Sequence, residues 1–430
     1  MTKRAWWLVG LNILVPGSAQ VLAGSRRAGR FGLGATLVLW VLVVVGIVMA
    51  IVARGTLISI FTNTIVLSVL VVALLFYAVL WLSLTLDTLR LIRLVRVAPS
   101  ARGFVAGLSV VALALVSGTA AYGAVSVTAG IGLLDSVFAE RASEPPIDGR
   151  YNILLLGGDA GPDRDGLRPD SISVASVDAE TGEVVLLGVP RNLEQVPFSD
   201  GSPLYTRFPD GYDCGSNCLI DYLYSYATVF HPELYPDAED QNSNPGIEAM
   251  RDAVEGVLGI TLQYYVLIDM QGFADLIDAL GGIDITVEDR VPIGANENLD
   301  GTHAEPVGYI EAGEQHMDGR RALAYARSRY ATTDYARMER QRQVQEAILA
   351  QASPANVLTH FTDIARAGAQ VVRTDIPKQM LSYFVQLGEK SQDHEVVSHD
   401  FVPPEIDPED PDYELIRQTV QDLIAPKDEG

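Results

Sequence analysis

The second half of the chain contains an Arg-x-Arg segment, Arg327-Ser328-Arg329, whose spacing suits phosphate chemistry. In an extended segment, residues two apart project to the same side, so the two guanidinium groups would lie side by side. Two parallel guanidinium groups match the oxygens of a phosphate, because each can donate a pair of hydrogen bonds. The segment therefore predicts a phosphate-binding site.

A helix predicted over residues 334–352 carries the next polar residues. At 100° per residue, positions 334, 337, 341, 344 and 348 share one stripe, and Val344 and Ile348 indicate that this stripe faces the core. The stripe begins with three polar residues, Asp334, Arg337 and Gln341. Because burying an unpaired charge is costly, these side chains form either an internal ion network or the lining of a polar pocket. In a pocket, the start of the helix would favour an anion.

Acidic and basic residues also flank three predicted strands. Asp159 follows a buried-looking strand, Arg168 and Asp170 precede the next strand, and Arg191 follows a third. Ligands commonly bind at strand ends in α/β sheets, although a solvated turn and a salt-bridged loop are simpler explanations of the two acids. Carboxylates are hard ligands, so Asp159 and Asp170 are candidates to hold Mg²⁺ or Mn²⁺. Such an ion would bridge phosphate oxygens while arginines stabilise the developing charge.

Cys214 and Cys218 are the only cysteines, four residues apart in a loop that contains Gly and Asn. A zinc site needs about four ligands, and no His or further Cys lies close in sequence. We therefore expect a disulfide that closes a small loop, with two free thiols as the alternative. A disulfide implies an oxidising compartment outside the cytoplasm.

Charge and hydropathy divide the 430-residue chain into two parts. Residues up to about 135 are apolar and nearly free of acids, whereas the rest contains almost all of the 54 Asp and Glu, which outnumber the 31 Lys and Arg. The formal charge of −23 argues against nucleic acid as a partner. Arginines far outnumber lysines, so any cationic site here is built largely from arginine.

Three apolar stretches of the first part reach the roughly 20 residues that a membrane span requires. They run over residues 31–53, 65–89 and 104–134, and a fourth, 5–22, is short and broken by Pro16-Gly17. The fourth stretch is either a span or a re-entrant or interfacial segment. Arginines cluster before the first long stretch and between the second and third, and the positive-inside rule places both clusters in the cytoplasm. We expect a multi-pass protein of the cell membrane with everything after residue 135 outside the cytoplasm.

The remainder of the chain has the pattern of a layered α/β domain. We expect a polar linker at 135–150 and the domain at 151–425. Short β-rich runs alternate with amphipathic runs, as they do where helices cover a sheet. Strands are predicted at 152–157, 171–177, 183–189, 262–268, 283–287 and near 395–402, and helices at 245–258, 270–280, 334–352 and near 355–368, 376–388 and 411–424.

Taken together and in this order, these segments resemble the catalytic domain of the LytR-CpsA-Psr family. The matching stretches are NILLLGGD (152–159), RPDSISVASVD (168–178), VVLLGVPRN (184–192), LQYYVLIDMQGFADLIDALGGIDITV (262–287) and GRRALAYARSRYATTDYARMERQRQV (319–344). The resemblance covers roughly residues 148–355. Its most specific parts are the long match around Asp278-Ala279-Leu280-Gly281-Gly282 and the Arg-x-Arg…Asp-x-x-Arg-x-x-x-Gln pattern.

The resemblance implies an enzyme of cell-wall assembly. Members of the family transfer a glycopolymer from a polyprenyl-pyrophosphate carrier to peptidoglycan and form a phosphodiester link; teichoic acid, arabinogalactan and capsule all stay open as the polymer. The implied fold is an α/β/α sandwich with an apolar channel for the lipid. By motif, Asp159 and Asp170 would hold Mg²⁺, and Asp334 would position or deprotonate the acceptor hydroxyl. The pyrophosphate would be bound by Arg168, Arg191, Arg327, Arg329 and Arg337, with Gln341 completing the site.

Two features depart from the family pattern. Asn192 stands where the family usually has an aspartate, so one carboxylate is missing. The several apolar stretches replace the single span that the family usually has. Two other functions stay open on the sequence: a pyrophosphate hydrolase that uses water on the same site, and a non-catalytic lipid-carrier binder that regulates the envelope.

Overall fold

The computed structural model describes residues 2–425 with several gaps. The gaps are residues 53–55, 58–59, 62, 93–97, 140, 160–167, 295–304, 329–332, 353–355, 357–359, 361–362 and 365–371. The chain divides into two compact units, which we call the helical unit (Met1–Leu134) and the α/β unit (Asp135–Gly430).

The helical unit contains the predicted spans as helices. Three of its described helices are long and apolar enough to cross a membrane: α3 (Arg26–Val52), α5 (Thr64–Ile92) and α6 (Pro99–Val137), the last over Ala101–Gly132. At about 1.5 Å per residue, each exceeds the roughly 30 Å of a bilayer's hydrocarbon core. A helix satisfies its own backbone hydrogen bonds, which a lipid surrounding requires.

The apolar stretch before these helices folds as two short pieces, α1 (Thr2–Leu14) and α2 (Ser18–Ala23). The chain turns at Gly17, whose φ of 97° lies in the left-handed region that favours glycine. A Cβ atom at Gly17 would lie 2.3 Å from the backbone nitrogen of Leu33, so the two segments approach closely here. Neither piece alone has the roughly 20 residues of a span, which favours a re-entrant or interfacial segment.

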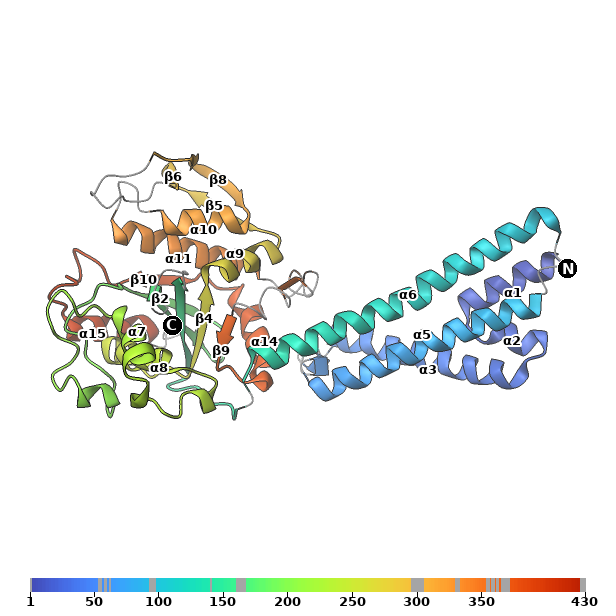
Figure 1. The fold of residues 1–430 in the computed structure, drawn as a ribbon, viewed down its shortest axis with the longest axis horizontal. Helices are drawn as coiled ribbons and strands as arrows, with labels where there is room; N and C mark the ends of the chain where they lie inside the picture. The colour runs from blue at the N-terminus through green and yellow to red at the C-terminus, as the bar shows by residue number, and fades with distance from the viewer. Residues whose placement is uncertain are drawn as a thin grey trace, which may run out of the picture. The chain divides into compact units, whose positions relative to one another are not determined.

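The α/β unit is built on a six-stranded mixed sheet with the order β10-β3-β2-β1-β4-β9 (Figure 1). Its strands are β1 (Arg150–Asp159), β2 (Arg168–Asp178), β3 (Val184–Val189), β4 (Tyr264–Asp269), β9 (Val372–Thr374) and β10 (Val397–Asp400). Antiparallel pairs join β1 to β2, β2 to β3 and β4 to β9, and parallel pairs join β1 to β4 and β3 to β10. Every residue of β3 is buried, as its uninterrupted apolar run predicts.

The main core lies between this sheet and the helices α8 (Pro245–Leu258) and α15 (Tyr413–Ile424). Helix α8 has the predicted bounds because Asn244 caps its first turn, accepting from the backbone of Ile247 at 3.0 Å, and Gly259 ends it with a φ of 69°. A separate cluster around Tyr151 packs against α14 (Leu381–Ser391). Strands and helices thus pack together in both clusters, which confirms the mixed α/β class.

A smaller core holds the elements that follow β4. It contains α9 (Met270–Ala279), α10 (Gly319–Arg327), α11 (Asp334–Gln351), β5 (Ile283–Val287), β6 (Val291–Ile293), β7 (Gly308–Ile310) and β8 (Gly313–Met317). Strands β5 and β8 form one two-stranded sheet, and β6 and β7 form another. The fully buried Ile277, Ile283 and Val344 join these elements.

The remaining described elements are short and lie mostly between β3 and α8. They are η2 (Pro203–Thr206), α7 (Tyr222–Ser225), η3 (Tyr226–Phe230), η4 (Pro232–Leu234), η5 (Glu239–Gln241) and, near the end of the chain, η6 (Lys378–Met380). The helix predicted near 355–368 falls largely outside the described residues. The helix predicted near 376–388 forms instead as η6 followed by α14.

The segment 135–150 is attached to the α/β unit along much of its length. Helix α6 continues to Val137, and the backbone of Ala139 then donates to the carbonyl of Ile376 at 3.0 Å. Arg141 follows with an ion pair to the buried carboxylate of Asp375 at 2.9 Å. The segment was predicted as a separate linker from its Pro and polar residues, but paired groups hold it against the unit.

Candidate functional site

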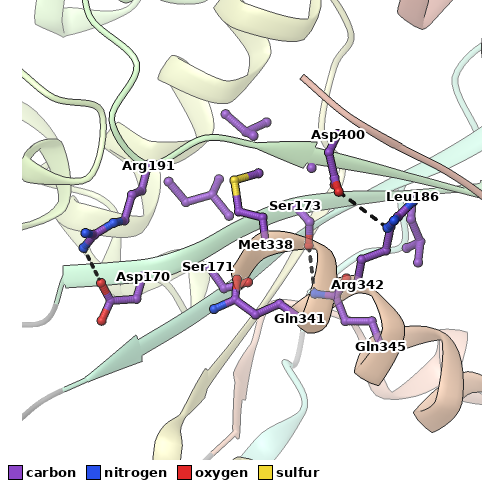
Figure 2. Close-up of a pocket in the computed structure, with 13 residues that line it drawn as sticks. Asp170, Ser171, Ser173, Leu186, Arg191, Met338, Gln341, Arg342, Gln345 and Asp400 are labelled. Atoms are coloured by element: carbon purple, nitrogen blue, oxygen red, sulfur yellow. Dashed lines mark hydrogen bonds and ion pairs between the residues drawn. The ribbon is translucent and has the colours of Figure 1, made fainter. Parts of the chain in front are cut away.

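The ends of two neighbouring strands bring an acid and an arginine of the predicted site together. In the antiparallel register Ile172 lies opposite Val189, so Asp170, two residues before, and Arg191, two residues after, reach the same edge of the sheet. Their side chains form an ion pair, with Nη1 of Arg191 2.6 Å from Oδ1 of Asp170 (Figure 2). About a quarter of each side chain is exposed, so the pair borders solvent.

Helix α11 adds Arg337 next to this strand end. Arg337 is 2% exposed, and its Nη2 donates to the backbone carbonyl of Asp170 at 3.4 Å. Val344, on the same stripe, is fully buried, as the helical spacing predicts. The buried guanidinium therefore places a second positive charge beside the backbone of Asp170.

A small pocket, partly open to solvent, lies between β2, β3 and α11 (Figure 2). Gln341 lines it together with Asp170 and Arg191, and Gln345 donates to the hydroxyl of Ser173 at 3.1 Å. The residues around it are Asp170, Ser171, Ile172, Ser173, Leu186, Gly188, Val189, Arg191, Met338, Gln341, Arg342, Gln345 and Asp400. Of the described side chains in the polar stripe of α11, Gln341 lines this pocket, whereas Arg337 is buried beside the backbone carbonyl of Asp170.

Arg168 begins β2 and is held by an aromatic ring. Its guanidinium lies 4.1 Å from the ring centre of Tyr222, a cation–π contact that fixes the long side chain. In the register of β1 and β2, Arg168 pairs with Asp159. The backbone of Asp159 therefore ends β1 at this edge, while its side chain lies outside the described part of the chain.

The Arg-x-Arg segment differs from the prediction. Arg327 is the last residue of α10 and is exposed, so its own backbone is helical and not extended. Helix-favouring residues precede it, and Ser328 is the first to leave helical geometry. Arg329 lies outside the described residues. Asp334 begins α11, but its side chain is not among those described.

Sequence reasoning missed one acid of this region, Asp221. It is 4% exposed, and its backbone N–H donates to the carbonyl of Arg191 at 3.3 Å. Burial raises the pKa of Asp221 to about 6, against the opposing effect of Arg191 and Arg168. The only signal in the sequence is an acid inside the apolar run Cys218–Leu223, a pattern that solvated loops share.

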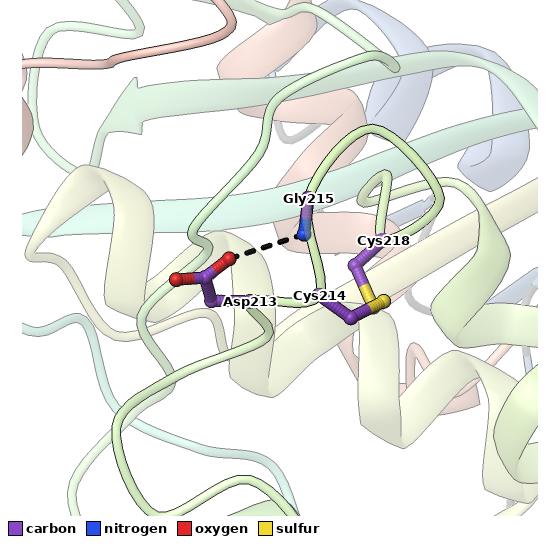
Figure 3. The surroundings of a disulfide bond; sticks show 4 residues. All are labelled: Asp213, Cys214, Gly215 and Cys218. Carbon is purple, nitrogen blue, oxygen red and sulfur yellow. Dashed lines mark hydrogen bonds between the residues drawn. A yellow bond between two sulfur atoms is a disulfide. The ribbon is translucent and has the colours of Figure 1, made fainter.

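The two cysteines lie where the sequence predicts a bridge. Their sulfur atoms are at disulfide distance, and their Cα atoms are 5.3 Å apart (Figure 3). The loop between them turns at Gly215, whose N–H donates to Oδ1 of Asp213 at 3.2 Å. This loop ends three residues before Asp221.

No group of three or more His, Cys, Asp or Glu side chains suited to a metal ion occurs among the described residues. The residues present still fit a divalent cation, because Asp170 offers a carboxylate at the strand ends. Oδ1 of Asp221 is buried and has no hydrogen-bond partner within the described part of the chain. An oxygen left in this state is the kind of atom that a hard cation coordinates.

Comparison with known proteins identifies the family. The LytR_cpsA_psr family model matches residues 135–410, well over half of the chain. The chain belongs to the LytR-CpsA-Psr family. The stretches on which the resemblance rests, from 152 to 344, all fall within the matched region.

Several proteins similar to this LytR-CpsA-Psr chain carry the name polyisoprenyl-teichoic acid–peptidoglycan teichoic acid transferase. TagU of Halalkalibacterium halodurans is 28% identical over 246 residues, which are 56% of this chain and 64% of that protein. TagV of Bacillus subtilis is 28% identical over 211 residues, 49% of this chain and 45% of TagV. This chain therefore spans less than two thirds of the length of either relative.

Solved structures of similar chains include two from the same group of proteins. The crystal structure of B. subtilis TagV has a TM-score of 0.46 and 24% sequence identity, covering 65% of this chain and 99% of that chain. TagT bound to LIIa-WTA has a TM-score of 0.46 and 19% identity, covering 66% of this chain and 92% of that chain.

Proposed function

We propose that this LytR-CpsA-Psr protein transfers a glycopolymer from a polyprenyl-pyrophosphate carrier to peptidoglycan, forming a phosphodiester link. The observation that carries the proposal is the convergence of Arg191, Asp170 and Arg337 at one edge of the sheet. An anion with several oxygens fits such a cluster, because each guanidinium donates to two oxygens at once. The names of the relatives support the substrate class, since those proteins act on polyisoprenyl-linked teichoic acid and peptidoglycan.

The proposed reaction needs few protein groups. The acceptor hydroxyl oxygen bonds to the phosphorus next to the sugar, and the bond from that phosphorus to the bridging oxygen breaks. Polyprenyl phosphate leaves with the bridging oxygen, and the hydroxyl proton passes to a carboxylate, for which Asp334 at the start of α11 is the candidate. Arg168, Arg191, Arg327, Arg329 and Arg337 would hold the diphosphate and stabilise charge on its oxygens, with Gln341 beside them.

Mg²⁺ or Mn²⁺ is the proposed cofactor. Asp159 and Asp170 would hold the ion, which when bound would neutralise charge on the phosphate oxygens. Asp170 already pairs with Arg191. A cation held by Asp170 and the guanidinium of Arg191 would therefore both contact the same diphosphate. This arrangement of a hard cation beside arginines is suited to phosphoryl transfer.

We also propose that the α/β unit lies outside the cytoplasm as an α/β/α domain with a lipid channel. The distribution of arginine around α3, α5 and α6 supports this side of the membrane, as does the cysteine pair at disulfide distance. Protease added to cells stripped of their wall should cleave the α/β unit. Protection of that unit until the membrane is permeabilised would contradict the placement.

The direct test of the activity is a transfer assay on full-length protein in detergent with a lipid-linked donor. With peptidoglycan present, the protein should form polymer–peptidoglycan and release polyprenyl phosphate. Arg191→Ala and Asp170→Ala should each lower transfer by at least about 100-fold, since each removes charge that acts on the diphosphate. Arg290→Ala is the matched control, because that side chain is exposed and pairs with Glu311.

The same assay separates the alternatives. Release of polyprenyl phosphate without polymer transfer would identify a hydrolase. Full transfer by both site variants would exclude a reaction at this site. Donor binding without either product, together with unchanged envelope polymer in cells that carry the variants, would identify a non-catalytic regulator.

A further inference from the structure

Asp221 is a buried carboxylate that the proposed reaction does not yet use. Asp221 is 4% exposed, and the described residues offer no hydrogen bond to its Oδ1. A buried carboxylate oxygen without a partner costs free energy, which folded proteins usually avoid by pairing the group. Because Asp221 lies beside a predicted binding site, its Oδ1 is a candidate for contact with a ligand.

The backbone places Asp221 beside the position where the family's aspartate is missing. The N–H of Ile220 donates to the carbonyl of Leu193 at 3.0 Å, and the N–H of Asp221 donates to that of Arg191 at 3.3 Å. Asn192 is the residue between these two carbonyls. The backbone of Asp221 thus lies beside that of Asn192, although the two residues belong to different segments of the chain.

The charges that act on Asp221 are those of the proposed site. They are Arg191, Arg168, Asp170 and Arg337. With Asp221 included, these groups sum to three positive and two negative charges, a net charge of +1. Without the charge of Asp221 the same set is +2, so an ionised Asp221 lowers the positive charge that these groups present to an anion.

We propose that Asp221 supplies the carboxylate that Asn192 lacks and makes binding of the diphosphate depend on a divalent cation. The proposal rests on the proposed function of this site. In the absence of a cation, Asp221 repels the diphosphate. When a cation is present, Oδ1 of Asp221 coordinates it as a hard ligand, and the bound cation attracts the diphosphate.

Calorimetric titration of the full-length protein with inorganic pyrophosphate, with and without Mg²⁺, tests the proposal. Wild type should bind pyrophosphate at least about tenfold more tightly when Mg²⁺ is present. Asp221→Asn should bind about tenfold more tightly than wild type without Mg²⁺ and should gain little when Mg²⁺ is added. Adding Asn192→Asp to Asp221→Asn should restore the dependence on Mg²⁺. Asp213→Asn, which removes an exposed acid nearby, is the matched control and should behave as wild type.

Two outcomes would overturn the proposal. One is a folded Asp221→Asn variant that binds pyrophosphate as wild type does under both conditions. The other is a double variant that responds to Mg²⁺ no better than Asp221→Asn. The transfer assay keeps the two claims apart: if Arg191→Ala abolishes transfer, the proposed function stands whatever Asp221 does, and if Arg191→Ala leaves transfer intact, the proposed function fails.

Discussion

Arg337 defines the site at the scale of single residues. A guanidinium that is 2% exposed cannot lose its charge and is costly to bury, so its surroundings must supply acceptors. The carbonyl of Asp170 is one of them, at 3.4 Å. The carboxylate of the same residue pairs with Arg191, so Asp170 joins two arginines from different elements. A diphosphate would then meet two donors whose positions are fixed before it binds.

Asp221 makes the stability of the fold depend on pH. Burial raises its pKa to about 6, above the ordinary value of 3.8, so the folded state retains this proton more readily than the unfolded state. The stabilising effect of the proton is present below about pH 4 and is lost as pH rises through 6. We expect Asp221→Asn to raise the thermal stability of the full-length protein at pH 7.5, by on the order of 2 kcal/mol, with no gain at pH 4.

Thermal unfolding of wild type and Asp221→Asn across this pH range checks the expectation. Asp213→Asn provides the comparison, since its acid is exposed. A variant less stable than wild type at pH 7.5 would show that the charged carboxylate stabilises the fold. In that case Asp221 would be a structural residue, because burial of its charged form would stabilise the fold. A functional residue, by contrast, is often buried at a cost in stability.

Several of the site residues could be predicted from sequence, and the reasons differ by residue. Arg337 follows from helical spacing, because Val344 on the same stripe must be buried. Asp170 and Arg191 follow from their positions at strand ends, which the register brings together. Asp221 could not be predicted, since its burial depends on two backbone hydrogen bonds from a segment without regular structure. The extended backbone predicted for Arg327 was wrong because α10 extends through it.

At the scale of elements, the packing of α10 on α9 positions the end of α10 that carries Arg327. A Cβ atom at Gly319 would lie 1.9 Å from the carbonyl oxygen of Ala274, so only glycine allows this approach. Gly319 also donates its N–H to Oδ1 of Asp278 at 2.7 Å, which fixes the start of α10. These contacts join two of the stretches that resemble the family, 262–287 and 319–344.

Gly319→Ala should therefore push α10 away from α9 and destabilise the α/β unit. We expect the free energy of unfolding to fall by about 2 kcal/mol, seen as a melting temperature lower by roughly 5 °C. The rate of polymer transfer to peptidoglycan should fall as well. Gly308→Ala is the matched control, because a Cβ atom there meets nothing within 4 Å. Equal melting temperatures for the two variants would show that α10 accommodates the added methyl group.

Elements were predictable where their pattern was long and their ends were marked. Helix α8 begins after Asn244 and ends before Gly259, both of which are typical helix boundaries. Strands β6, β7 and β9 have three residues each, too few for an alternating pattern to be recognised. Segment 135–150 looked like a linker because its partners, such as Asp375, are more than 200 residues away in sequence.

At the scale of the whole molecule, the chain combines a unit of apolar helices with an α/β unit of a cell-envelope family. The substrate proposed for the α/β unit has a polyprenyl tail, which resides in a membrane. Helices long and apolar enough to cross a membrane would hold the protein where such a substrate is found. The diphosphate of the carrier is the part of the substrate that the arginines would recognise.

The most direct test of this account is a structure of the full-length protein bound to polyprenyl pyrophosphate with Mg²⁺. The account predicts phosphate oxygens within hydrogen-bond distance of both Arg191 and Arg337, with the ion beside Asp170. A diphosphate bound elsewhere, with the Arg191–Asp170 ion pair unchanged from 2.6 Å, would contradict it.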